Sequence, residues 1–128
     1  MISRKLKRML INISNHPTST WSKRQMETAI AQFDEVVDFP FPQIDPESST
    51  EQIKILAQQL FDELIDSYDK ENITIHLMGE LSIVYQLVNL FKKADIPCVV
   101  STTKREVEEL PDGSINSLFR FVKFRAYY

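Results

Sequence analysis

The sequence contains few of the residues on which several protein classes depend. Its 128 residues include one cysteine, two histidines and two glycines. One cysteine allows no internal disulfide, so we expect a reducing, cytoplasmic location. One cysteine and two scattered histidines form no zinc-site pattern, and we expect neither a metal nor another cofactor. Charged residues interrupt every apolar stretch well before the length that crosses a membrane.

Several catalytic motifs are also missing. There is no G-x-G-x-x-G for a dinucleotide, no Walker lysine motif and no G-x-S-x-G elbow of the α/β-hydrolases. The net charge of −3 and the isoelectric point of about 5.4 argue against binding to duplex nucleic acid. A small anionic ligand is still compatible with this charge, because it needs only a local positive pocket.

The amino-terminal residues 1–8 are basic and precede a short apolar run, residues 9–13. A signal peptide has a longer apolar region and a cleavage site of small residues. Polar residues follow this run at once, so we expect a solvated overhang before a first strand.

Apolar runs and amphipathic segments alternate along the chain, which is long enough for one domain. The alternation predicts strands at residues 9–13, 35–39, 72–78 and 97–102, with helices at 21–33, from about 48 to 66, and at 81–94. This order predicts parallel strands with helices on both faces of the sheet. The tail, with an Asp-Gly turn between residues 105–109 and 118–124, predicts an antiparallel β-hairpin. We therefore expect a single α/β domain over residues 1–128: a Rossmann-like three-layer sandwich with strand order 2-1-3-4 and the hairpin at the sheet edge.

Two of the expected helices begin with capping signals. Ser19 or Thr20 is expected to cap the first helix. The second helix has two overlapping capping boxes, Ser48 with Glu51 and Ser49 with Gln52.

Ligands of open parallel sheets bind beyond the carboxyl ends of the strands, where the strand order reverses. In the order 2-1-3-4 the reversal lies between the first and third strands. Hydroxyls, a glycine, a helix amino terminus and two cations come together there, which is the mixture that an anion site uses. The residues expected at this edge are Ser14, Asn15, His16, Gly79, Glu80, Ser82, Ser101, Thr102, Thr103, Lys104 and Arg105.

Some of these residues also have purely structural explanations. Gly79 permits a tight turn from strand to helix, and a carboxylate at position 80 favours the positive end of that helix. Lys104 and Arg105 are also compatible with a solvated strand end. Within the strands, His76 is expected to be a hydrogen-bonded core histidine and Cys98 to pack in the core.

The last two fifths of the chain resembles a known family. The resemblance is carried by the run that begins Gly-Glu-Leu-Ser at Gly79, the segment Ser101–Arg105, the Asp112–Gly113 turn and the aromatic, basic tail Phe119–Tyr127. These segments are similar to those of the small stand-alone CRISPR-associated Rossmann-fold (CARF) proteins. Such proteins accompany type III CRISPR antiviral defence, and some are ring nucleases.

The resemblance implies a homodimer that binds a cyclic oligoadenylate across its axis, with neither duplex nucleic acid nor a membrane as a partner. Some members also cleave the ring without metal, by aligning a ribose 2′-hydroxyl with its neighbouring phosphate. On this reading Ser14, Lys104 and Arg105 are the catalytic residues, and the other residues at the edge, apart from Ser101, bind the ligand. Cleavage and binding alone both stay open. So do an enzyme acting on another nucleotide and a non-catalytic interaction module built on the hairpin Phe119–Tyr128.

Overall fold

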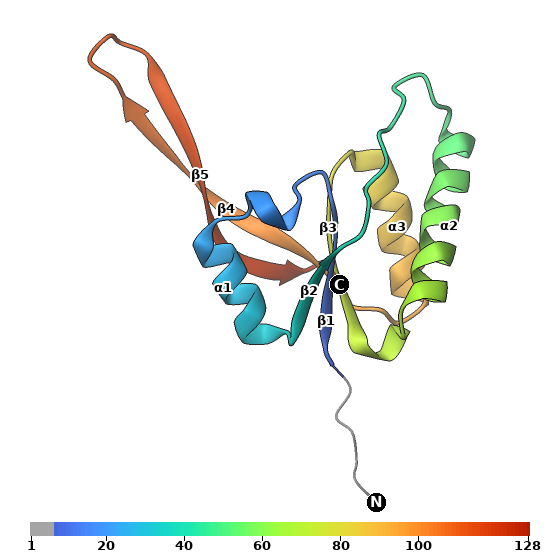
Figure 1. The fold of residues 1–128 in the computed structure, drawn as a ribbon. Helices are drawn as coiled ribbons and strands as arrows, with labels where there is room; N and C mark the ends of the chain where they lie inside the picture. The colour runs from blue at the N-terminus through green and yellow to red at the C-terminus, as the bar shows by residue number, and fades with distance from the viewer. Residues whose placement is uncertain (1–6) are drawn as a thin grey trace, which may run out of the picture.

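The computed structural model describes residues 7–128 (Figure 1), so most of the basic overhang lies outside the described residues. The elements are, in chain order, β1 (Met9–Ser14), the 3-10 helix η1 (Thr18–Thr20), α1 (Lys23–Gln32), β2 (Glu35–Asp38), α2 (Thr50–Ser67), the 3-10 helix η2 (Lys70–Asn72), β3 (Ile73–Met78), α3 (Leu81–Lys93), β4 (Cys98–Glu109) and β5 (Ile115–Ala126). None of the described helices combines the length and the apolar character that crossing a membrane requires.

The strands form one sheet in the order β2-β1-β3-β4-β5. β1 pairs in parallel with both β2 and β3, and β3 pairs in parallel with β4. β5 runs antiparallel to β4 and closes the edge. The expected order and parallel pairing of the first four strands are therefore confirmed, and the protein is an α/β protein with a mostly parallel sheet.

Helices lie on both sides of this sheet, with α2 and α3 together on one side and α1 on the other (Figure 1). The core lies under α2 and α3. Alternate residues of β1 and β3 face this core, and the apolar stripes of both helices cover them. Its fully buried members include Ile11, Ile75, Leu77, Leu64, Leu87 and Phe91.

The helix starts agree only partly with the capping signals. Ser22 caps α1 by accepting a hydrogen bond from the Gln25 amide at 3.1 Å. The cap expected at residues 19–20 is wrong, because those residues belong to η1. Of the two capping boxes expected for α2, the structure forms that of Ser49 and Gln52.

β4 is longer than the sequence pattern predicted. It runs from Cys98 to Glu109 without a break, so the first strand of the expected hairpin is the outer part of β4 itself. A register shift between Thr102 and Thr103 interrupts the β4–β5 ladder. Beyond that shift the two strands leave the body as a two-stranded arm, residues 103–121 (Figure 1).

Candidate functional site

A pocket of about 590 Å³ lies at the carboxyl ends of β1 and β2 and beside the start of α3. It lies at the edge where the strand order reverses, with β2 and β3 on opposite sides of β1. Its size is within the range of small-molecule sites. The lining residues are Ser14, Asn15, Pro17, Asp38, Phe39, Pro40, Phe41, Pro42, Gln43, Ile44 and Glu80.

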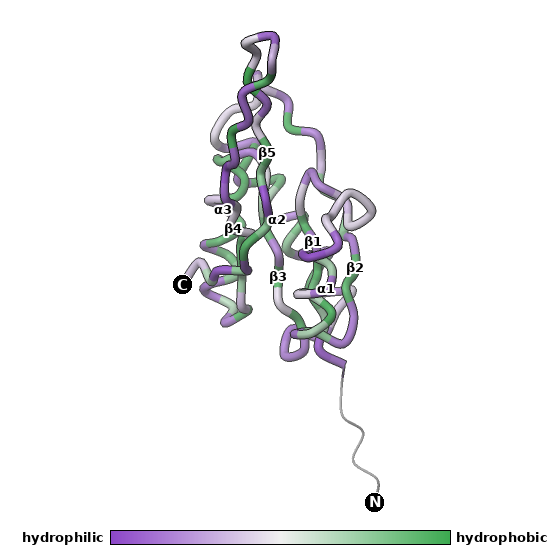
Figure 2. Tube along the Cα trace, turned by 90° about the vertical axis from the view of Figure 1, so that its left-hand side faces the viewer, coloured by the Kyte–Doolittle hydropathy of each residue, from purple (hydrophilic) through white to green (hydrophobic). Residues whose placement is uncertain are grey.

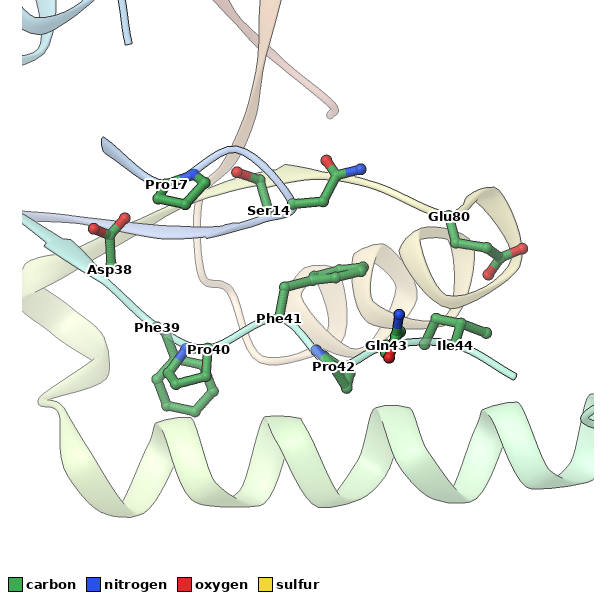
Figure 3. Close-up of a pocket in the computed structure, with 11 residues that line it drawn as sticks. Ser14, Pro17, Asp38, Phe39, Pro40, Phe41, Pro42, Gln43, Ile44 and Glu80 are labelled. Atoms are coloured by element: carbon green, nitrogen blue, oxygen red, sulfur yellow. The ribbon is translucent and has the colours of Figure 1, made fainter. Parts of the chain in front are cut away.

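The loop after β2 forms most of the apolar wall of this pocket. Its prolines keep residues 40–46 extended, so the loop runs across the strand ends instead of starting a helix. Figure 3 shows the Phe41 ring directed from this loop into the space between Ser14 and Glu80. A Cβ atom at Gly79 would lie 2.5 Å from Cζ of Phe41. The glycine therefore allows the aromatic ring to lie directly against the backbone after β3.

Two carboxylates, Asp38 and Glu80, lie at opposite ends of the pocket (Figure 3). Glu80 caps α3, because its carboxylate accepts hydrogen bonds from the amides of Ser82 and Ile83, both at 3.0 Å. The Ser82 hydroxyl donates to the same group. Hydrogen bonds from the Ser82 hydroxyl and these two amides lower the pKa of Glu80. The protein's own carboxylate thus occupies the helix amino terminus that a ligand phosphate would need.

Asp38 is held as firmly at the other end. Its oxygens accept hydrogen bonds from Asn12 Nδ2 at 2.9 Å, from the Thr18 amide at 3.1 Å and from the Thr18 hydroxyl at 2.8 Å. Desolvation alone would raise the pKa of the Asp38 carboxyl, but these hydrogen bonds together hold it below its usual value. Asp38 therefore carries a negative charge at neutral pH.

Behind the pocket, polar side chains on the α1 face of the sheet form one hydrogen-bond network. Asn12 Nδ2 points at two acceptors, the His16 carbonyl and Asp38, each at 2.9 Å. Asn12 Oδ1 must then face His76 Nδ1 and the Ser14 hydroxyl, both at 2.8 Å. An amide oxygen only accepts, so Nδ1 of His76 carries the proton.

The other ring nitrogen of His76 extends the network to β4. Its Nε2 accepts a hydrogen bond from the Ser101 hydroxyl at 2.7 Å, and the Ser101 oxygen accepts one from Gln25 at 3.0 Å. The rings of Trp21 and Phe124 cover the imidazole, with centroids 5.1 and 5.6 Å away. Burial, with a smaller contribution from His16, lowers the pKa of His76 to about 4.

This chain of hydrogen bonds resembles a catalytic triad, with Ser101 in the place of the nucleophile, His76 of the base and Asn12 of the orienting group. A base with a pKa of about 4 is weak at neutral pH, and Ser101 does not line the pocket. The network serves to hold the strand ends in place. The expectation of a hydrogen-bonded core histidine is confirmed, and so is the burial of Cys98, which is 2% exposed.

The structure brings together part of the set of residues expected at this edge. Ser14, Asn15 and Glu80 line the pocket, and Gly79 lies under Phe41. The Ser82 hydroxyl donates to Glu80, and Ser82 does not line the pocket. His16 contributes its backbone carbonyl to the network, but its side chain is not part of the pocket wall.

The remaining expected residues lie away from the pocket. The Thr102 hydroxyl donates to the Lys123 carbonyl at 3.1 Å. Thr103, Lys104 and Arg105 are exposed on the arm, where Arg105 donates to the Ser117 hydroxyl at 3.1 Å. Because β4 continues outward beyond the sheet, its cations do not line the pocket, and no lysine or arginine of the described residues does.

Comparison with known proteins gives one family. Residues 8–125 match the model of the uncharacterized protein MJ1673 family. The chain belongs to that family. A search of curated proteins finds no match. The description of this family names no ligand or reaction.

Sequence reasoning missed several residues of this MJ1673-family site. In the pocket wall, residue 39 was expected at the end of a strand and residues 40–44 were given no role, and neither Asp38 nor Asn12 was singled out. The available signal was a run of prolines and aromatics directly after a strand, at the edge where ligands bind. Among residues 7–128, no group of three histidine, cysteine or acidic side chains is placed to hold a metal.

Proposed function

We propose that the pocket binds the nucleoside part of a small nucleotide, and that this nucleotide is a cyclic oligoadenylate. One observation carries the first part: a pocket of about 590 Å³ has apolar walls and a carboxylate at each end, at the reversal of the strand order. The second part takes the ligand class from the CARF resemblance. The proposal also includes a Rossmann-like three-layer sandwich, which the strand order and the helices on both sides of the sheet support, and a cytoplasmic location, which the single cysteine supports.

The pocket walls suit a nucleobase. Phe41 and the neighbouring prolines offer flat apolar surfaces, and stacking of a base on an aromatic ring is worth about 1–3 kcal/mol. Asp38 and Glu80 can accept hydrogen bonds from ribose hydroxyls or from the amino group of adenine. A base that enters between them would displace water from the Phe41 ring.

The phosphates of such a ligand must stay outside the pocket. Both carboxylates repel them, and no cation of the described residues lines the wall. Lys104 and Arg105 can reach phosphates only where these project beyond the sheet edge. We therefore propose that a single copy of the chain binds the nucleotide and does not cleave it. Ser14 then serves as an orienting hydroxyl, and it already hydrogen-bonds to Asn12 and His16.

A titration of the full chain tests this proposal. Cyclic tetra-adenylate and cyclic hexa-adenylate are added in the presence of chelator, and heat and reaction products are both followed. We expect saturable binding of one ring, competition by adenosine and no linear product. Linear product would instead establish a metal-independent ring nuclease.

A matched pair of variants locates the site. Phe41→Ala removes the aromatic wall and should weaken binding about tenfold or more. Tyr85→Ala is the control, because Tyr85 is an exposed aromatic residue on α3 that does not line the pocket. If neither ring binds, the ligand class is wrong. If a ring binds equally well to both variants, the pocket is wrong.

A further inference from the structure

Several apolar side chains of the arm are largely exposed among the residues that the structure describes. Phe119 is 68% exposed, Ile115 is 65% exposed and Val107 is 58% exposed. Figure 2 shows hydrophobic and hydrophilic segments alternating along the arm at the top of the view. An isolated two-stranded ribbon is marginally stable in water, and exposed apolar strands tend to associate. The arm therefore has the character of a surface that is covered in a complex.

The ladder register sorts these side chains onto one face of the arm. Arg105 is opposite Phe119, Val107 is opposite Ser117, and Glu109 is opposite Ile115. Alternation along each strand places all six on the same side. We call these three pairs the apolar arm face. The opposite arm face is more highly charged, with Lys104, Glu106, Glu108 and Arg120.

Charge changes sign along the arm. Lys104, Arg105 and Arg120 lie near its base, whereas Glu108 and Glu109 lie near its tip. On the apolar arm face, Arg105 lies beside Phe119 at the base end, and Glu109 lies beside Ile115 at the tip end. Such a face is complementary to a copy of itself turned end for end.

We propose that two copies of this chain pair through the apolar arm face, with their arms antiparallel. A two-fold axis across the arms at the row of Val107 and Ser117 places Phe119 over the partner's Ile115. The same operation places Arg105 over the partner's Glu109, and both contacts occur twice because the interface is isologous. This pairing does not depend on the proposed ligand.

The alternatives fit the charge pattern less well. A parallel arrangement of the two arms would place the cations of the two bases side by side, and the tip carboxylates likewise. A bound nucleic acid would place its phosphates against those carboxylates, and like charges repel. In the antiparallel arrangement, the cation at the base of each arm faces the carboxylate at the tip of the other arm.

A charge-swap series on the full chain tests the pairing, with molecular mass followed by sedimentation over a range of concentrations and without ligand. The unsubstituted chain should form a dimer. Phe119→Ser should weaken dimerisation by about a hundredfold or more, since the residue acts twice. Arg105→Glu alone and Glu109→Arg alone should each weaken it about tenfold, and the double variant should restore it.

The opposite arm face provides the matched control. Lys104→Glu with Glu108→Lys changes charges of the same kind on the other side of the same strand, and should leave the dimer unchanged. Circular dichroism of each variant verifies that the sheet is folded. A chain that stays monomeric, or a dimer that is insensitive to Phe119→Ser and to both single charge changes, would overturn the proposal. Because no ligand is present, failure here is separate from failure of the nucleotide-binding test.

Discussion

The two faces of the central sheet are made by alternate residues of the same strands, yet their chemistry differs: the side of α2 and α3 is apolar, whereas the side of α1 buries polar residues next to the apolar Leu10. Toward α2 and α3, β1 and β3 present Ile11, Ile75 and Leu77, all fully buried among other apolar side chains. Toward α1, the same strands present Asn12 and His76, which are equally buried. No buried side-chain nitrogen or oxygen of the described residues is without a hydrogen-bond partner.

The apolar face and the polar face therefore contribute differently to the fold. Apolar burial is nondirectional, so one face stabilises the sheet without fixing the positions of individual atoms. Hydrogen bonds are directional, and a broken buried one leaves other groups unsatisfied. The polar face therefore fixes the strand ends that border the pocket. Four changes test this contrast.

The largest loss is expected on the apolar face. Leu77→Ala should lower the free energy of unfolding by about 2–5 kcal/mol, because it removes buried contacts and leaves a cavity. Chemical denaturation measures this change. Ile30→Ala, at a residue 63% exposed on α1, is the control and should cost less than about 0.5 kcal/mol. Equal losses at the two positions would contradict the assignment of the core.

The polar face should make stability depend on pH. Burial lowers the pKa of His76 from 6.5 to about 4, so the unfolded state binds more protons than the folded state between these values. Stability is then complete above pH 6.5 and falls as the pH decreases to about 4, by roughly 3 kcal/mol in total. Denaturation at a series of pH values measures this slope. His76→Gln cannot titrate, and a slope unchanged in this variant would exclude His76 as its cause.

Asn12 should show that the polar face acts as a unit. Asn12→Ala removes the amide that donates to Asp38 and accepts from His76. It should lower the free energy of unfolding by about 2–3 kcal/mol. Asn12→Asp keeps the acceptor but places a second carboxylate against Asp38, so it should be least stable at neutral pH and recover as the pH falls. Thermal unfolding at pH 7 and pH 5 separates the two variants. An Asn12→Asp variant that is most stable at neutral pH would contradict the assigned orientation of the amide.

The smallest effect is expected at the margin of the network. Ser101→Ala removes the hydrogen bond to His76 and the acceptor for Gln25. His76 is buried, but Ser101 and Gln25 are only partly buried, so water can replace the lost hydroxyl. We expect a loss of about 1 kcal/mol in the free energy of unfolding. A loss as large as that of Asn12→Ala would extend the essential part of the polar face to β4.

Much of the fold could be predicted from local patterns. The period of the apolar residues located the strands and helices, and the Asp-Gly turn located the hairpin. The continuity of β4 through residues 103 and 104 was missed because these residues are polar, as residues at the end of a strand often are. They stay in the strand because pairing with β5 satisfies their backbone groups while their side chains reach solvent. This pairing depends on residues about twenty positions away.

The site was predicted in position but not in composition. The reversal of strand order located the edge, and Ser14, Asn15 and Glu80 do line the pocket there. Glu80 caps its own helix, which removes the anion site expected from the sequence. Whether a helix amino terminus is free or occupied depends on the side-chain conformation of the residue before it, and spacing alone does not reveal that.

The sequence by itself determined the α/β class, the order of the parallel strands and the edge at which a ligand can bind. These properties follow from local periodicity and from the handedness of crossover connections, which act wherever the chain folds. Only the tertiary structure decided that the polar residues of β1, β3 and β4 share one network, and that Lys104 and Arg105 lie on an arm outside the pocket. Both results depend on the register between distant strands, because a shift of one residue would turn each side chain to the other face.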